Sequence, residues 1–350
     1  VEPLEKKNVL LEMEIPDTGE YVLTLSFVLR EDTLWAKRGH EIAYGQEVIG
    51  KMEAHEPSKK PYTVTKGWHN IGVKGEDFEV LFSILHGGLV SYRYGGVEML
   101  KAIPKPNFWR ALTDNDVANL LPFRAGQWKV ASMFSTFKYN HGRAATDCTL
   151  EEAEDHITVT YTYHLPVRPQ MDCEVAYSVY GDGEVKVKMT MDPSAEVGEL
   201  PEYSMLFTMD ADYDHLRWYG LGPEETYVDK CHAKLGLYHN KVADNMAKYL
   251  VPQECGNKIG VRYAKVTDEH GRGLLIQGDQ LHFSALPYSP HELDNALHMT
   301  ELPPVHYTFI RVGLAQMGVA GDDTWGALTH PEYLIDNSKK LTLTFSFRGI

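Results

Sequence analysis

Residues 21–29 read Tyr-Val-Leu-Thr-Leu-Ser-Phe-Val-Leu, so a large apolar side chain recurs at every second position. Successive side chains of a strand point to opposite faces of its sheet, and this period of two is typical of a half-buried β-strand. The same alternation returns at 157–163, 184–191, 273–276 and 341–347, and turns rich in glycine, proline and aspartate separate these runs. The sequence therefore predicts an all-β protein.

One segment has the signature of a helix instead. Ser289 is a suitable N-cap, and Pro290 follows it at the first helical position. Leu293, Ala296 and Leu297 would then lie on one face of the helix and pack against the core.

Composition limits the classes of function. The chain has 350 residues, of which 43% are hydrophobic and 24% charged, enough for one or two full cores. Its net charge of −15 would repel a phosphate backbone, so nucleic acid is not an expected partner. Because no apolar run approaches the ~18 residues of a membrane span, and the first residues lack a signal-peptide core, we expect a cytoplasmic protein without a membrane partner.

Metal and redox motifs are not evident in the sequence. The cysteines at 148, 173, 231 and 255 are scattered without a Cys-x-x-Cys pair, which argues against a zinc ribbon or a redox motif. His291 and His298 come nearest to a histidine cluster, but seven residues place them two helical turns apart. We therefore expect no metal site in this chain.

A polar, proline-rich stretch at 53–62 marks a domain boundary. We predict one domain part at 1–54, a linker at 55–66 and a large double-sheet domain at 67–350. The first part has about half of the ~100 residues that an immunoglobulin-like sandwich needs. It should therefore leave one face of its sheet uncovered.

Four short motifs stand out from the strands, and the first runs Asn-Phe-Trp-Arg-Ala-Leu-Thr-Asp-Asn-Asp at 107–116. Its aromatic pair can anchor a loop in the core, while Arg110 pairs with Asp114 or Asp116.

Another motif, Pro-Gln-Glu-Cys-Gly-Asn-Lys at 252–258, opens a strand and is interpreted mainly as scaffold.

Residues 218–227 form a second motif, Trp-Tyr-Gly-Leu-Gly-Pro-Glu-Glu-Thr-Tyr, whose glycines suit a tight loop at a strand end. Adjacent side chains of an extended chain point in different directions. Glu224 and Glu225 are therefore poor candidates for the facing carboxylates of a glycosidase, which lie about 5 Å apart in retaining enzymes.

The last motif, Gln-Met-Gly-Val-Ala-Gly-Asp-Asp-Thr-Trp-Gly at 316–326, places an indole in a loop of glycine and aspartate. A tryptophan in such a loop has less reason to be core than one in an alternating strand. Its flat face can stack on the C–H face of a sugar ring, and the carboxylates of Asp322 and Asp323 can bind hydroxyls. Trp325 is therefore a candidate for substrate binding.

These motifs resemble, in the same order, four runs in the final domain of the large bacterial β-galactosidases of glycoside hydrolase family 2. The family runs are Phe/Trp-Arg-Ala-Pro-Thr-Asp-Asn-Asp, Trp-x-Gly-x-Gly-Pro-x-Glu-x-Tyr, Pro-Gln-Glu-x-Gly-Asn and Gly-Gly-Asp-Asp-Ser-Trp-Gly. Residues 34–46 are similar to the end of the immunoglobulin-like domain that precedes it. Leu112, Ala320 and Thr324 depart from the family's proline, glycine and serine, which alters loop stiffness more than chemistry.

The resemblance implies a galactose-mutarotase-like supersandwich that follows a partial immunoglobulin-like sandwich. It implies a retaining hydrolase of terminal β-D-galactosides such as lactose, whose acid/base and nucleophile belong to a preceding (β/α)₈ barrel. This chain would then hold no catalytic residue, and Trp325 would supply one aromatic wall of the active site. It also implies a fragment of one long chain rather than a separate small subunit.

The resemblance further implies partners. These are the galactoside, the catalytic barrel and the N-terminal domains of the parent enzyme, and further copies in a homo-oligomer. Mg and Na ions of the parent would be held mainly by other domains, so this chain needs no cofactor of its own. The alternative is a free-standing carbohydrate-binding or aldose-epimerase-like module on the same fold, which as an epimerase would need a histidine acid and a glutamate base facing one sugar.

Overall fold

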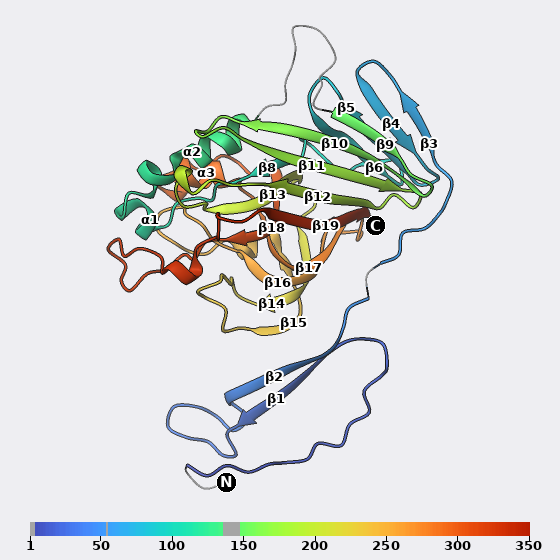
Figure 1. The fold of residues 1–350 in the computed structure, drawn as a ribbon. Coiled ribbons are helices and arrows are strands. Elements are labelled where there is room, and N and C mark those ends of the chain that lie inside the picture. The colour runs from blue at the N-terminus through green and yellow to red at the C-terminus, as the bar shows by residue number, and fades with distance from the viewer. Residues whose placement is uncertain (1–3, 54, 136–147) are drawn as a thin grey trace. The chain divides into compact units, whose positions relative to one another are not determined.

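The chain separates into two compact units, Val1–Glu56 and Pro57–Ile350 (Figure 1). The computed structural model describes residues 4–53, 55–135 and 148–350. Strands dominate both units, which confirms the predicted all-β class. No helix among these residues is long and apolar enough to cross a membrane.

The first unit is a two-stranded antiparallel hairpin of β1 (Gly19–Val28) and β2 (Glu41–Lys51). β1 contains most of the alternating stretch 21–29. Its apolar side chains remain accessible, for example Phe27 at 61% and Ile42 on β2 at 56%. Within the described part of this unit no second sheet covers them.

The second unit is built from two sheets. The smaller sheet has the order β3-β4-β5-β6-β7, with antiparallel neighbours. Its strands are β3 (Thr63–Lys66), β4 (Asn70–Lys74), β5 (Phe78–Ser83), β6 (Gly88–Tyr94) and β7 (Val97–Glu98). β3 occupies the last four residues of the range expected to be the linker.

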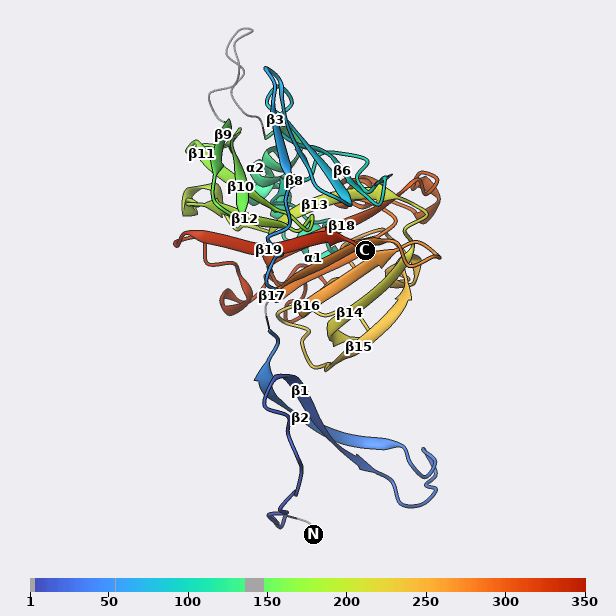
Figure 2. The same cartoon turned by 90° about the vertical axis from the view of Figure 1, so that its right-hand side faces the viewer.

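The larger sheet has twelve strands among the described residues, and its main path runs β15-β14-β16-β17-β19-β12-β11-β10-β9. β13 pairs with β8 and β18, and β18 joins this group to β17. Figure 2 shows β14 to β17 side by side, with β19 crossing the middle of the unit. The strands are β8 (Lys105–Asn107), β9 (Cys148–Glu152), β10 (His156–Leu165), β11 (Met171–Tyr180), β12 (Val185–Met191), β13 (Glu202–Asp210), β14 (His215–Gly222), β15 (Lys234–Lys241), β16 (Lys258–Thr267), β17 (Gly273–Leu286), β18 (Tyr307–Gln316) and β19 (Leu341–Gly349).

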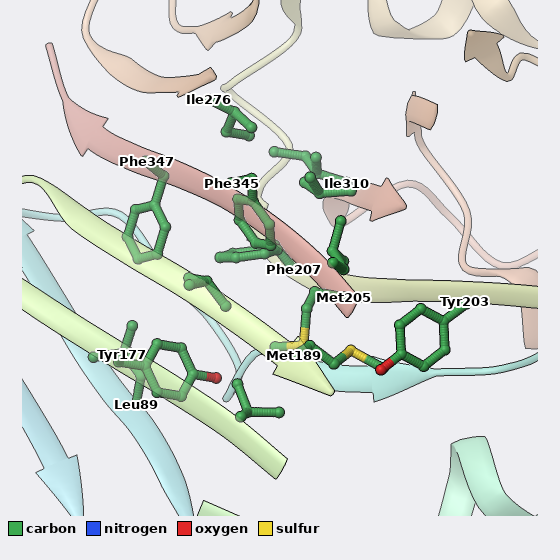
Figure 3. Packing of buried hydrophobic residues seen from close by; sticks show 14 of the residues in the cluster. Leu89, Tyr177, Met189, Tyr203, Met205, Phe207, Ile276, Ile310, Phe345 and Phe347 are labelled. Carbon is green, nitrogen blue, oxygen red and sulfur yellow. The ribbon is translucent and has the colours of Figure 1, made fainter. Parts of the chain in front are cut away.

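The core lies between the sheets. Burial alternates strictly along β10 and β12, so each strand turns one face inward. Phe82 of the smaller sheet packs against Tyr177 of β11 at 5.6 Å between ring centroids, and Phe345 of β19 packs against Phe207 at 6.0 Å. Figure 3 shows Phe207, Phe345 and Phe347 meeting in the same cluster.

Three α-helices lie in the described part of the second unit, α1 (Asp114–Ala118), α2 (Leu121–Phe134) and α3 (Pro290–Asn295). The predicted helix start is confirmed, because Ser289 caps α3 and forms a capping box with Glu292. The predicted extent is too long: Ala296 already has extended backbone angles, and Leu297 is 68% exposed instead of packed. Helix α2, the longest of the three, was not predicted.

Candidate functional site

The predicted substrate-binding residues lie on one loop between β18 and β19, which we call the Trp325 loop (residues 317–330). In Figure 1 it is the red-orange segment beside α1. The indole of Trp325 is 85% exposed. This agrees with the expectation that the glycine- and aspartate-rich loop presents it rather than burying it.

Arg110 fixes the start of the loop. Its guanidinium is fully buried and donates to the backbone carbonyls of Met317 and Gly318, at 2.5 and 2.9 Å. It also binds both carboxylate oxygens of Asp116, at 2.9 and 3.2 Å. Of the two partners expected for Arg110, the structure therefore selects Asp116. The bonds to the loop were not anticipated.

The loop closes on itself near the same point. The backbone N–H of Gly318 donates to the carbonyl of Tyr333, and the hydroxyl of Thr329 donates to the carbonyl of Gly318. Asp229, which follows the second sequence motif, accepts from the backbone N–H of Ala320 at 2.8 Å. These contacts leave the segment around Trp325 as the projecting part of a closed loop.

The two candidate carboxylates have different surroundings. One oxygen of Asp323 accepts from the backbone N–H groups of Trp325 and Ala327, at 2.8 and 3.2 Å, so this side chain shapes the turn that carries the indole. The Asp322 carboxylate is exposed and pairs with Nε2 of His330 at 2.9 Å. That hydrogen bond raises the pKa of His330 above its ordinary value.

Helix α1 lies against the loop. The side chain of Asn115 contacts the loop backbone on both sides of Trp325, and Asn119 donates to the carbonyl of Ala327 at 3.4 Å. Neither asparagine was predicted to serve the site. The Thr-Asp-Asn-Asp run did predict local turns, but nothing in the spacing indicates a contact with residues about 208 positions away.

Glu225 of the second sequence motif and Glu254 of the third are both engaged in structural contacts. Glu225 accepts from Lys230, Tyr249 and the backbone N–H of Gly256. Burial alone would raise its pKa, but these hydrogen bonds outweigh burial and lower it. Glu225 therefore acts as a structural acceptor.

Glu202 and Glu254 approach each other through Arg311, which binds both carboxylates at 2.6 Å. The three side chains are at most 5% exposed. Burial raises the pKa of Glu202, and the charge of Arg311 opposes that effect. The cavity beside Glu254 and Arg311 is too small for a water molecule, so a sugar cannot reach these groups in this conformation.

Two family models of β-galactosidases match the chain. The family model described as "Beta galactosidase small chain" matches residues 74–348, and the model described as "Beta-galactosidase, domain 4" matches residues 1–50. The chain therefore belongs to the β-galactosidase small chain family.

Two relatives illustrate the range of lengths. A β-galactosidase of Halalkalibacterium halodurans is 38% identical over 97% of this chain and 34% of its own length. A β-galactosidase small subunit of Latilactobacillus sakei is 32% identical over 80% of this chain and 95% of its own length. The chain spans about a third of the length of the first of these relatives. A solved galactose mutarotase-like protein from Lactobacillus casei is 11% identical, with 80% of this chain and 100% of that chain covered and a TM-score of 0.41.

Proposed function

We infer that this chain is the C-terminal, non-catalytic part of a retaining β-galactosidase of glycoside hydrolase family 2. In this role it lends Trp325 to a galactoside site whose acid/base and nucleophile lie in another part of the enzyme. The observation that carries the proposal is the 85% exposure of Trp325 on a loop whose base is held by a buried arginine, in a chain of this family. The substrates would be terminal β-D-galactosides such as lactose.

The chemistry of the loop supports this role. A sugar presents a face of C–H groups that packs on an indole, while its edge of hydroxyls requires hydrogen-bond partners. Asp323 uses one carboxylate oxygen for the turn, which leaves its second oxygen as a candidate acceptor from a hydroxyl. Asp322 can serve the same purpose if it exchanges His330 for the sugar.

Exposed apolar side chains beside the loop support a partner at this end of the second unit. Phe123 at the start of α2 is 85% exposed, and Leu120 and Leu328 are 56% and 58% exposed. Contact with another protein surface would remove these side chains from water, which is favourable in free energy. We assign this surface to the catalytic part of the enzyme, since a site completed by Trp325 requires that part to be adjacent.

The remaining parts of the proposal follow from the resemblance. Residues 1–54 would belong to an immunoglobulin-like sandwich, 55–66 to a linker and 67–350 to a mutarotase-like supersandwich. The enzyme would be a cytoplasmic homo-oligomer, with Mg and Na ions held mainly outside this chain. The match to a β-galactosidase family favours this role over a free-standing carbohydrate-binding or epimerase-like module.

The test compares the chain alone with the chain joined to, or mixed with, the catalytic part of a relative. We expect hydrolysis of a nitrophenyl galactoside only in the assembled form, because the transition state needs two carboxylates that this chain does not supply. In that form Trp325→Ala should raise KM by roughly fivefold to 150-fold, the equivalent of about 1 to 3 kcal/mol of lost stacking.

Trp68 provides the matched control, because it is also a tryptophan and is 89% exposed, on the turn between β3 and β4. Trp68→Ala should leave KM unchanged. Turnover by the chain alone that survives removal of contaminating enzyme would disprove the non-catalytic role. An equal KM for Trp325→Ala and the unmodified enzyme would disprove the substrate contact.

A further inference from the structure

We propose that Asn115 is the positioning residue for Trp325, a role that rests on the proposed function of the loop. Its side-chain N–H donates to the carbonyl of Asp323 at 2.7 Å, and its side-chain oxygen accepts from the backbone N–H of Gly326 at 3.1 Å. Asp323 lies two residues before the indole and Gly326 one residue after it. One amide thus holds the backbone on both sides of Trp325.

Asn115 is itself fixed. It lies on α1, is 9% exposed, and is preceded by Thr113, which forms a capping box with Asp116. Asp116 is bound in turn by the buried Arg110. Gln253 accepts from the backbone N–H of Asp114 and donates to its carboxylate, both at 3.3 Å. Because the surroundings hold Asn115 rigidly, its side chain can fix the position of the neighbouring loop.

The loop is pressed against α1 at the position that Asn115 holds. Gly326 has φ +107°, and a Cβ there would lie 2.9 Å from the Cβ of Ala118. Only glycine accepts both this angle and this approach without strain. The turn made by Asp323 gives the loop its local shape, but its bonds stay within the loop. Among the bonds that join the loop to the rest of the unit, those of Asn115 are the ones that hold the backbone on both sides of the indole.

The pair of bonds requires an amide. Asparagine offers a donor and an acceptor at once, whereas an ionised aspartate of the same shape only accepts. Asn115→Asp keeps an acceptor for Gly326 but places a carboxylate against the carbonyl of Asp323. Asn115→Ala removes both bonds. In the assembled enzyme we expect either change to raise KM about fivefold, which corresponds to the loss of one to two ordinary hydrogen bonds. The effect on kcat should be smaller, because Asn115 positions the indole and does not take part in the chemical step.

The experiment uses the assembled enzyme, with Asn115→Ala made both in the presence of Trp325 and in the Trp325→Ala background. If Asn115 acts through the indole, its substitution raises KM only while Trp325 is present. Hydrogen exchange at the Gly326 amide gives a second readout, since loss of the Asn115 acceptor should speed that exchange at least tenfold. Asn295→Ala, an exposed asparagine on α3, is the control and should change neither quantity.

The outcomes distinguish a failure of the positioning role of Asn115 from a failure of the proposed function of Trp325. Unchanged exchange at Gly326 in Asn115→Ala overturns the positioning role. The same rise in KM with and without Trp325 also overturns it, because a general loss of stability would act in both backgrounds. If Trp325→Ala leaves KM unchanged, the proposed function fails, and the exchange of Gly326 still decides whether Asn115 holds the loop.

Discussion

Replacing Arg110 by methionine should be among the most destabilising single changes in the second unit. Methionine has a similar length but no charge, so Asp116, 3% exposed on its side chain, would remain as a buried carboxylate without its cation. Removing one member of a buried ion pair costs about 3 to 5 kcal/mol, because the remaining charge cannot reach water. The carbonyls of Met317 and Gly318 would also lose their donor, which makes the upper end of this range the better estimate.

Urea unfolding of the chain, followed by far-ultraviolet circular dichroism, measures the effect as a lower midpoint. The double variant Arg110→Met/Asp116→Asn removes the stranded charge but keeps an acceptor for the cap of α1, and should recover about 2 kcal/mol. Arg124→Met is the matched control. Arg124 is a partly exposed arginine on α2 that pairs with Glu199 and also donates to Asn119, but it leaves no buried charge behind, so its loss should cost about 1 kcal/mol. Equal midpoints for Arg110→Met and Arg124→Met would refute the reasoning.

Three further predictions concern stability. Lys258 is 1% exposed, and burial lowers the pKa of its ammonium group to about 8. Its charge therefore opposes folding below that pH, and Lys258→Met should stabilise the unit by up to about 3 kcal/mol at pH 7. This gain should vanish as pH rises to about 10.5, where the lysine of the unfolded chain also loses its proton. Burial, and then the charge of Arg311, lower the pKa of His282 to about 4. The free energy of unfolding should therefore fall as pH drops from about 6.5 to 4, by up to about 3 kcal/mol, and a His282→Gln variant that falls equally would contradict this cause. Limited proteolysis should cut first within residues 53–61, between the two compact units; first cleavage elsewhere would argue against the boundary.

Several strands were predictable because one face is buried and the other is not, although β11, which also alternates in burial, was not predicted. The stretch 157–163 alternates in sequence because β10 alternates in burial. Helix α2 was missed because two of its buried positions are the small residues Ala125 and Ala131, with Trp128 as the only large ring between them. Its inward face is therefore only weakly apolar, and the 3.6-residue period is hard to detect.

The exposed tryptophan of the candidate site was predictable from the sequence, and its support was not. Trp325 could be located because an indole among glycines and aspartates contradicts the strand pattern. Its support could not, because Arg110 binds backbone carbonyls 207 and 208 residues away. A carbonyl is present at every residue, so the sequence carries no mark of which one the arginine will meet.

The place of β19 has a consequence for the order in which the large sheet can form. Among the described strands of this sheet β19 is the latest in sequence, yet it pairs with β12 on one side and β17 on the other. Ile350, directly after β19, exchanges two backbone hydrogen bonds with Gly273. The strands on either side of β19 can therefore join into one sheet only when this strand is in place, and until then β12 and β17 each present an unpaired edge. A substitution that keeps β19 from pairing would be far more damaging than the same change in a strand at the edge of the sheet.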